Sequence, residues 1–271
     1  ISELYKLNHF QWGGDYQNSL DKYLISKYVK VKQPSYEELL SKFDTEINTT
    51  VQNYVLSSWY NHWSSILIEN IFKQHPAVLP TIGQIKNVDF FINNIPFDLK
   101  VTYFPNEYIK QRRREIGLPP ELTFLKNKAT ELGIFFDKKD KTTNIQYEIT
   151  EKLKDRNDAI SSAVLNQLKQ ERLSIVTEAQ KNPKPLIQWL YENQGEMRFG
   201  AENRLFLILV DTDNFESSWK LKRNVDILQP VIHQYLNNFS KKDQLSLKIE
   251  FTYKNNPEKY NTLADCIFIV K

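Results

Sequence analysis

Asp89, Asp98 and Lys100 are the residues whose types and spacing point most directly to chemistry. Asp98 and Lys100 lie two residues apart in the apolar segment 95–104, which predicts a strand, and residues two apart on a strand share a face. Burying either charge without a partner would cost several kcal/mol. The pair therefore indicates either a structural ion pair or a functional site.

A second strand is predicted over residues 87–93, joined to the first by a tight turn at Asn93 and Asn94. So short a hairpin brings the carboxylate of Asp89 near that of Asp98. Two adjacent carboxylates repel each other unless a cation lies between them, and Mg²⁺ prefers such oxygen ligands. We therefore expect a hard divalent cation between the two aspartates.

Glu69 is the candidate for a third acid. It lies in a helix expected over residues 50–74, where it follows His62 by seven positions and Ile66 by three, and so shares their inward-facing side. The chain thus presents a glutamate on a helix, an aspartate on one strand and Asp-x-Lys on the next.

In this order the chain resembles the PD-(D/E)XK nuclease superfamily, which includes many type II restriction endonucleases. The resemblance is carried by Glu69, by Asp98-Leu99-Lys100 and by Val88-Asp89, where Val88 stands in place of the proline of the motif. A helix expected over 157–180 and an apolar strand over 204–211 fall where the family's αβββαβ core would place them.

The resemblance implies a restriction-endonuclease-like α/β fold, a mixed β-sheet flanked by helices. It also implies a metal-dependent DNA endonuclease, a sequence-specific type II enzyme of a bacterial restriction–modification system. Asp89, Asp98 and the backbone carbonyl of Leu99 would hold Mg²⁺, or Mn²⁺ in its place. Lys100 would orient or help to deprotonate the attacking water, and Glu69 would bind a second ion or orient the lysine. The substrate would be double-stranded DNA, the location the bacterial cytoplasm, and a palindromic target would favour a homodimer.

A basic stretch after the second strand is the candidate surface for DNA. Lysine and arginine side chains contact phosphates regardless of base sequence, but a charged run can equally be solvated surface, and both interpretations stay open. The candidates for phosphate contact are Lys110, Arg112, Arg113, Arg114, Lys126 and Lys128, and the residues that could touch bases are Tyr103, Asn106 and Tyr108.

A different enzymatic function is suggested by Asp211 and Asp213, which end the apolar strand in an Asp-x-Asp pattern. This resembles the nucleophile strand of haloacid-dehalogenase-like phosphatases. That family has Thr or Val two residues after the second Asp, whereas Phe215 stands here. We favour a strand end and a helix cap before Trp219.

The third possibility is a non-catalytic DNA-binding or assembly subunit on a nuclease-like fold. The intact set of Asp89, Asp98 and Lys100 speaks against it, because a decayed site usually loses at least one of the three.

The composition is that of a folded chain, since 41% of its 271 residues are hydrophobic and only 7 are glycine. The single cysteine, Cys266, excludes a disulfide framework and a cysteine-based zinc site, and indicates a reducing compartment. No stretch approaches the ~20 apolar residues that span a bilayer. The sequence contains no P-loop motif, so we do not expect a nucleotide cofactor. The net charge of +3 permits a nucleic-acid partner without requiring one.

Hydrophobic periodicity predicts a helical extension over residues 1–48 and a main domain over 49–271. Ser35 and Glu38 have the spacing of a capping box at the start of a helix. The remaining elements that we expect are helices over 16–30, 35–47 and 219–238, and strands near 133–136, 246–253 and 266–270.

Overall fold

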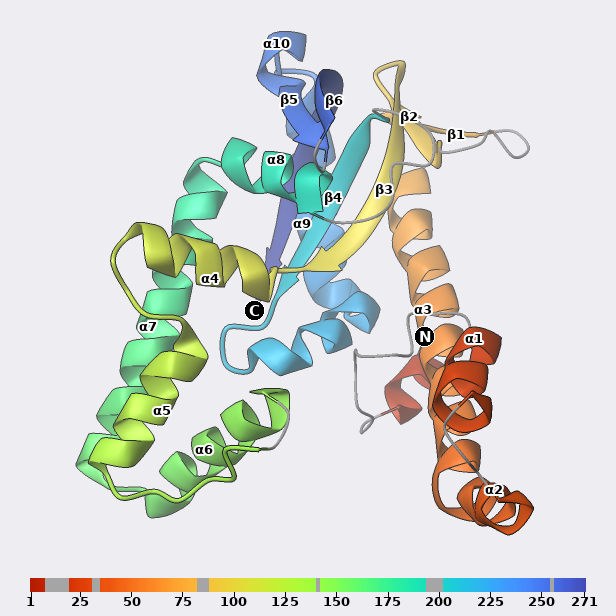
Figure 1. The fold of residues 1–271 in the computed structure, drawn as a ribbon. Helices are drawn as coiled ribbons and strands as arrows, with labels where there is room; N and C mark the ends of the chain where they lie inside the picture. The colour runs from red at the N-terminus through yellow and green to blue at the C-terminus, as the bar shows by residue number, and fades with distance from the viewer. Residues whose placement is uncertain (8–19, 31–34, 82–87, 140–141, 194–201, 254–255) are drawn as a thin grey trace.

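The structure is a computed structural model of the 271-residue chain, and it describes residues 1–7, 20–30, 35–81, 88–139, 142–193, 202–253 and 256–271. These residues form a mixed α/β fold in which helices flank a central sheet (Figure 1). None of the helices in the described ranges is both long enough and apolar enough to cross a membrane.

The sheet contains six strands in the described part of the chain, in the order β1-β2-β3-β4-β6-β5. Strands β1, β2 and β3 form an antiparallel meander, β4 and β6 continue the sheet parallel to β3, and β5 is antiparallel to β6. The strands are β1 (Val78–Pro80), β2 (Phe90–Ile92), β3 (Ile95–Tyr103), β4 (Arg204–Val210), β5 (Lys248–Tyr253) and β6 (Asn256–Val270).

The predicted hairpin is confirmed, but its first strand is shorter than the expected range of 87–93. Residue 87 lies outside the described ranges, and residues 88 and 89 precede the strand. Strand β2 pairs with β3 through Phe90 with Phe97 and Ile92 with Ile95, so only two residues make the turn. Asn93 and Asn94 both have positive φ angles, 48° and 64°. Two-residue turns of type I′ require this conformation at both positions, and asparagine adopts it more readily than most residues.

The N-terminal part of the chain is helical where it is described. The expected helix over 16–30 is present from residue 20 onward, and residues 16–19 lie outside the described ranges. The capping box is also present, because the backbone N–H of Glu38 donates to Ser35 Oγ and that of Ser35 donates to Glu38 Oε2. The elements are η1 (Ser2–Lys6), α1 (Leu20–Leu24), η3 (Ile25–Val29), α2 (Tyr36–Lys42), η4 (Phe43–Ile47) and α3 (Asn48–Lys73).

No break in the backbone marks the expected boundary at residue 48, because η4 ends at Ile47 and α3 begins at Asn48. Leu4 of η1 packs with Tyr60 of α3 and with Trp219. The first residues of the chain therefore contribute to the core of the main body.

Five helices connect β3 to β4 within the described ranges. The expected helix over 157–180 is confirmed as α7, which begins after Asp158, whose side chain accepts from the N–H of Ser161. The helices are α4 (Asn106–Glu115), α5 (Glu121–Glu131), α6 (Thr142–Arg156), α7 (Ala159–Lys181) and α8 (Lys184–Asn193).

The expected strand near 133–136 is wrong. Gly133 has a φ of 67° just after α5, and residues 134–136 run on without a strand partner. Phe136 packs into a core cluster formed by α5, α6 and α7, while Phe135 is 81% exposed. A short apolar run such as Ile134 to Phe136 does not by itself distinguish a strand from a loop that packs one of its side chains into the core.

The C-terminal part contains two helices where one was expected over 219–238. A 3₁₀ helix, η5 (Phe215–Arg223), is followed by α9 (Val225–Phe239), because Asn224 breaks the first and caps the second by accepting from the N–H of Ile227. The short helix α10 (Gln244–Leu247) precedes β5. Strand β5 covers the expected strand near 246–253 except for residues 246 and 247, which belong to α10. Strand β6 covers the expected strand near 266–270 and begins ten residues earlier, at Asn256.

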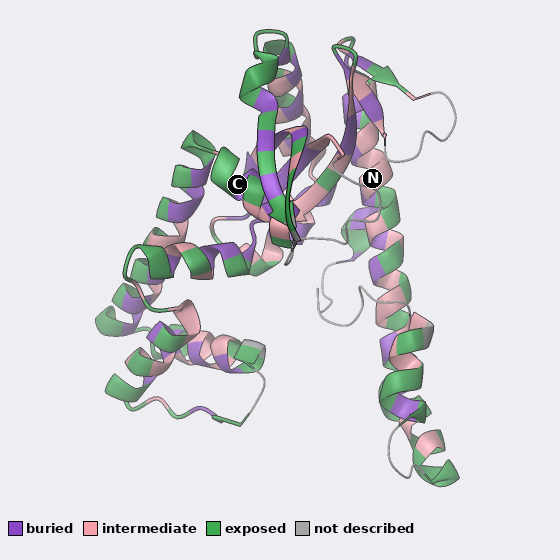
Figure 2. Cartoon of the chain, turned by 45° about the horizontal axis from the view of Figure 1, so that its top comes forward, coloured by how far each residue is buried: buried purple, intermediate pink, exposed green. Residues whose placement is uncertain are grey.

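Both faces of the sheet are buried (Figure 2). Leu205 and Leu207 of β4 point into one cluster with α3 and α9, whereas Phe206 and Ile208 point into another with α4, α7 and α8. This confirms the expectation of a strand buried on both sides, which is typical of a parallel strand covered by helices.

The turn at Asn93 and Asn94 provides a test of the hairpin. Alanine tolerates the left-handed region less well than asparagine, whose short polar side chain can hydrogen-bond locally, so Asn94→Ala should lower the free energy of unfolding by about 1 kcal/mol. Asn94→Gly should lower it less or not at all, because glycine has no such penalty. Urea unfolding followed by circular dichroism measures both, and equal stability of the two variants would contradict the assigned turn.

Candidate active site

Asp89 lies immediately before β2, next to the part of β3 that carries Asp98. Phe90 is the register partner of Phe97, and the N–H of Asp89 donates to the carbonyl of the same Phe97 at 2.9 Å. This bond holds Asp89 against the backbone of β3. The carboxylates of Asp89 and Asp98 are close enough for the charge of Asp98 to act on Asp89.

Asp89 is held where a negative charge is disfavoured. Its Oδ2 accepts a hydrogen bond from the N–H of Leu99 at 2.7 Å, which favours the charged form. Burial outweighs this bond and raises the pKa of Asp89 above its ordinary value, and the negative charges of Asp98 and Glu69 raise it further, while Lys100 opposes them. A cation next to Asp89 would relieve this unfavourable balance.

Asp98 lies between two cations. It is buried on β3, and Lys100 Nζ lies 2.9 Å from its Oδ1, with the lysine side chain 50% exposed. On the other side, Arg204 Nε of β4 lies 3.5 Å from Asp98 Oδ2. The expected shared face of Asp98 and Lys100 is thus observed, and Lys100 can reach both the carboxylate and the solvent.

Arg204 was not anticipated from the sequence. It is the direct partner of Asp98 in the parallel pairing of β3 with β4, and more than one hundred positions separate the two residues along the chain. Its only local signal is a charged residue at the first position of an apolar strand.

Glu69 lies on α3 at the margin of this site. Its Oε2 pairs with Lys73 Nζ at 2.9 Å, one helical turn away, and both side chains are about one-third exposed. Its charge acts on Asp89, but its neighbours Ile68 and Phe72 pack into the core on the α3 side of the sheet. Glu69 thus contributes negative charge beside Asp89 while it is paired with Lys73.

The oxygen atoms of this site fit a hard divalent cation. Asp89, just before β2, and Asp98, on β3, supply two carboxylates, and Leu99, which follows Asp98, supplies a backbone carbonyl. Among the residues that the structure describes, no group of three or more His, Cys, Asp or Glu side chains is arranged around one potential metal position. Mg²⁺ suits so small a donor set, since it usually keeps several waters and is held by one or two carboxylates plus substrate phosphate.

The arginine run does not form a single basic face. Arg113 is completely buried, where its Nε donates to the carbonyl of Pro119 at 2.8 Å and its Nη1 lies 2.5 Å from Glu171. This corrects its expected role, because a side chain committed to joining α4 and α7 does not reach phosphates. Arg112 bridges Glu115 and Glu178, whereas Arg114 is exposed.

The neighbouring lysines are also partly engaged. Lys110 pairs with Glu107 at 3.0 Å and Lys128 with Glu131 at 2.7 Å, each on its own helix, while Lys126 is half-buried. Exposed pairs of this kind contribute little to stability and can exchange partners at low cost.

The candidate base-contacting residues divide in the same way. Tyr103 packs on the side of the sheet opposite Asp98, against the cluster of Tyr60 and Trp219. Tyr108 is buried edge-to-face against Phe104. Tyr108 is a core residue, which corrects its expected role, whereas Tyr103 is half-buried and lies on the face of the sheet opposite Asp98. Asn106 is exposed at the start of α4.

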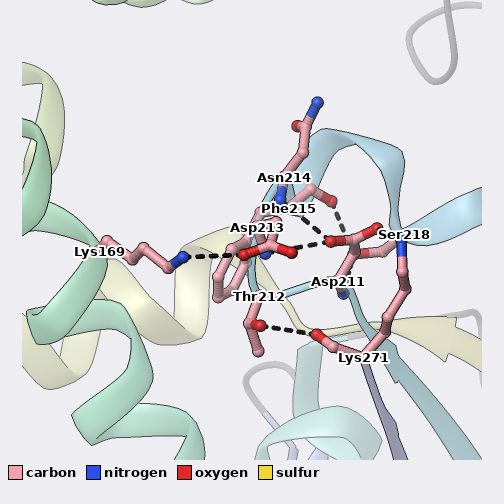
Figure 3. Close-up of polar contacts among 8 residues, drawn as sticks. All are labelled: Lys169, Asp211, Thr212, Asp213, Asn214, Phe215, Ser218 and Lys271. Atoms are coloured by element: carbon pink, nitrogen blue, oxygen red, sulfur yellow. Dashed lines mark hydrogen bonds and ion pairs between the residues drawn. The ribbon is translucent and has the colours of Figure 1, made fainter.

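Asp211 and Asp213 form the turn between β4 and η5 (Figure 3). Asp211 is buried, and its Oδ1 accepts from the N–H groups of Asp213 and Asn214, each at 3.1 Å. Asp213 points outward to Lys169 on α7 at 2.9 Å, and this hydrogen bond lowers the pKa of Asp213. The strand end that we favoured is present, but the position before η5 is occupied by Asn214 rather than by a capping Asp213.

Comparison with protein-family models, with curated proteins and with solved structures found no match to this chain.

The buried position of Arg113 leads to a test of its structural role. Arg113→Ala would leave Glu171 without its main partner in a largely buried position, so the free energy of unfolding should fall by about 3 kcal/mol. Arg114→Ala, on the exposed face of the same helix, should change it by less than about 0.5 kcal/mol. Urea unfolding compares the two, and equal small losses would show that Arg113 is not a structural residue.

The strained charge of Asp89 leads to a second test. The pKa of Asp89 is raised in the folded protein, so folding favours its neutral carboxyl over the ionised form. The stability that the neutral carboxyl contributes at low pH is therefore lost as the pH rises through that raised pKa. Asp89→Asn keeps an oxygen for the Leu99 N–H and removes the charge, so it should stabilise the metal-free protein by about 1 kcal/mol at pH 7. The gain should vanish as the pH falls low enough to protonate the wild-type carboxyl.

Asp213→Asn is the matched control, because the pKa of Asp213 is lowered and its charge is favourable. This variant should be slightly less stable than the wild type at pH 7. Thermal unfolding in EDTA across a pH series measures both, and a destabilised Asp89→Asn protein at pH 7 would refute the strained-charge assignment.

Proposed function

We propose that this protein is a metal-dependent DNA endonuclease with a restriction-endonuclease-like fold. The observation that carries the proposal is the proximity of Asp89, which accepts a hydrogen bond from Leu99 of β3, to Asp98 and its ion-pair partner Lys100. A purely structural ion pair would account for Asp98 and Lys100. It would not account for Asp89, whose charge is disfavoured by its surroundings.

The order of elements supports the same proposal. Helix α3, strands β1, β2 and β3, helix α7 and strand β4 occur in this order along the chain, and β4 is parallel to β3. Helices α4, α5 and α6 are inserted before α7, and α8 follows it. This agrees with the αβββαβ order of the PD-(D/E)XK core.

In the proposed reaction Asp89, Asp98 and the carbonyl of Leu99 hold Mg²⁺ or Mn²⁺. When bound, the ion supplies Lewis-acid polarisation of the scissile phosphate and stabilises the leaving oxygen. Lys100 is half exposed next to Asp98, so its ammonium group can donate to a phosphate oxygen or to the attacking water. Asp98 holds the ammonium group in place for that task.

The substrate in this proposal is double-stranded DNA, and the enzyme is a sequence-specific type II restriction endonuclease that acts as a homodimer in the bacterial cytoplasm. Of the basic residues after β3, Arg114 and Lys126 are the candidates for phosphate contact, with Lys110, Arg112 and Lys128 available if they exchange their acidic partners. Arg113 is no longer among them.

Two substitutions separate catalysis from binding. Asp98→Ala and Lys100→Ala should each reduce cleavage of plasmid DNA in Mg²⁺ by roughly 100-fold or more. In EDTA their effects on DNA binding should differ. Removing the negative charge of Asp98 should leave binding unchanged or strengthen it, and removing Lys100 should weaken it by about 1 kcal/mol.

Lys259→Ala is the matched control, because Lys259 is another strand lysine paired with a carboxylate, Glu250, at 2.9 Å. It should retain both cleavage and binding. Retained cleavage by a folded Asp98→Ala protein would end the proposal, and Asp211→Asn would then test the phosphatase alternative. Absence of cleavage by the wild type despite tight DNA binding would favour the non-catalytic subunit.

A further inference from the structure

The guanidinium group of Arg204 faces two carboxylates at the proposed site. Its Nε lies 3.5 Å from Asp98 Oδ2, and its Nη2 lies 3.6 Å from Glu202 Oε2. The three side chains are between 8% and 16% exposed. A cation therefore stands between Asp98 and a second buried acid that sequence reasoning did not identify.

Hydrogen bonds from three elements hold this segment in place. The side chain of Asn203 donates to the carbonyl of Pro96 at 3.2 Å and accepts from the N–H of Leu263 at 3.0 Å. Tyr191 and Thr262 donate to the carbonyl of Glu202 at 2.7 and 2.8 Å. The backbone on either side of Arg204 is thus fixed between β3 and β6, so the guanidinium group is directed at Asp98 by the fold.

The contacts of Arg204 are nevertheless loose. Both distances exceed the usual range of a charged hydrogen bond, and among the described residues the buried atoms Arg204 Nε and Glu202 Oε1 have no hydrogen-bond partner. By contrast, Arg172 binds Glu121 through two short bonds of 2.6 and 2.5 Å. The interaction of Arg204 with Asp98 is therefore mainly long-range charge attraction and not a directed hydrogen bond. A competing cation can displace Arg204 with a smaller loss of free energy than it would need to displace Arg172 from Glu121.

We propose that Arg204 is a positioning residue that competes with the divalent cation for Asp98, and that Glu202 retains its guanidinium group when Asp98 binds the cation. Arg204 rests over the ring of Tyr191 at 5.0 Å, which gives the group a second support when it leaves Asp98. The inference rests on the proposed function, because it assumes that Asp98 is a metal ligand. It adds that the affinity for the metal is set by a residue that does not touch the metal.

The test measures Mn²⁺ binding directly, from the electron paramagnetic resonance signal of free Mn²⁺, without DNA. Arg204→Met keeps the apolar stem and removes the competing charge, so it should bind Mn²⁺ more tightly by on the order of tenfold, which corresponds to about 1.4 kcal/mol. Glu202→Gln leaves Asp98 as the only acid in the described part of the chain that faces the guanidinium group, so this variant should bind Mn²⁺ more weakly.

A double substitution shows whether Arg204 acts through Asp98. In an Asp98→Asn background, Arg204→Met should no longer change Mn²⁺ affinity, because the group for which it competes is gone. Lys259→Met removes one positive charge at a distant surface pair and should leave Mn²⁺ affinity unchanged. Circular dichroism confirms the folding of each variant, and Arg204→Lys with Glu202→Gln carries the test if Arg204→Met does not fold. Lysine keeps the positive charge but lacks the forked edge of the guanidinium group. The Mn²⁺ affinity of Arg204→Lys should therefore lie between that of the wild type and that expected for Arg204→Met.

The failures can be told apart. Mn²⁺ binding by the wild type that Asp98→Asn leaves unchanged would refute the metal site and the proposed function with it. Binding that depends on Asp98 but is unaffected by the Arg204 and Glu202 substitutions would overturn only the role of Arg204. An effect of Arg204→Met that persists in the Asp98→Asn background would also overturn it.

Discussion

The site depends on the need to neutralise one buried carboxylate. Asp98 lies on a strand between two apolar layers, where an unpaired charge would cost several kcal/mol. Lys100 and Arg204 meet this need from the same strand and from its parallel neighbour. The parallel pairing of β3 with β4 is therefore an electrostatic requirement as well as a packing arrangement, since only that register sets Arg204 beside Asp98.

The two aspartates serve opposite purposes in this arrangement. Asp98 is balanced by cations, whereas Asp89 is placed where burial and neighbouring negative charges oppose its ionisation. An active site commonly contains such a pair of acids in contrasting environments, and the protein gives up some stability for it. The stability lost at Asp89 is offset by the surrounding core, in which the residues of β4 are buried on both faces.

How much could be predicted from the sequence depended on how far apart the interacting residues lie along the chain. The turn at Asn93 and Asn94 and the shared face of Asp98 and Lys100 follow from local backbone geometry, and both were predicted. The place of Arg204 depends on a pairing between distant strands, which local periodicity cannot reveal. Arg113 was misassigned for a related reason, because its burial depends on Glu171 of a helix far along the chain.

The position of the two aspartates within the sheet has a consequence for motion. Asp98 belongs to the interior strand β3, whereas Asp89 precedes β2, which is three residues long and pairs on its outer side only with the equally short β1. Short strands near a sheet edge open by local unfolding at lower free energy than the strands of a packed core. One half of the site therefore belongs to the most persistent cooperative unit of the fold and the other half to a less protected one. A ligand that bridges both would slow amide hydrogen exchange in β2 far more than in β3.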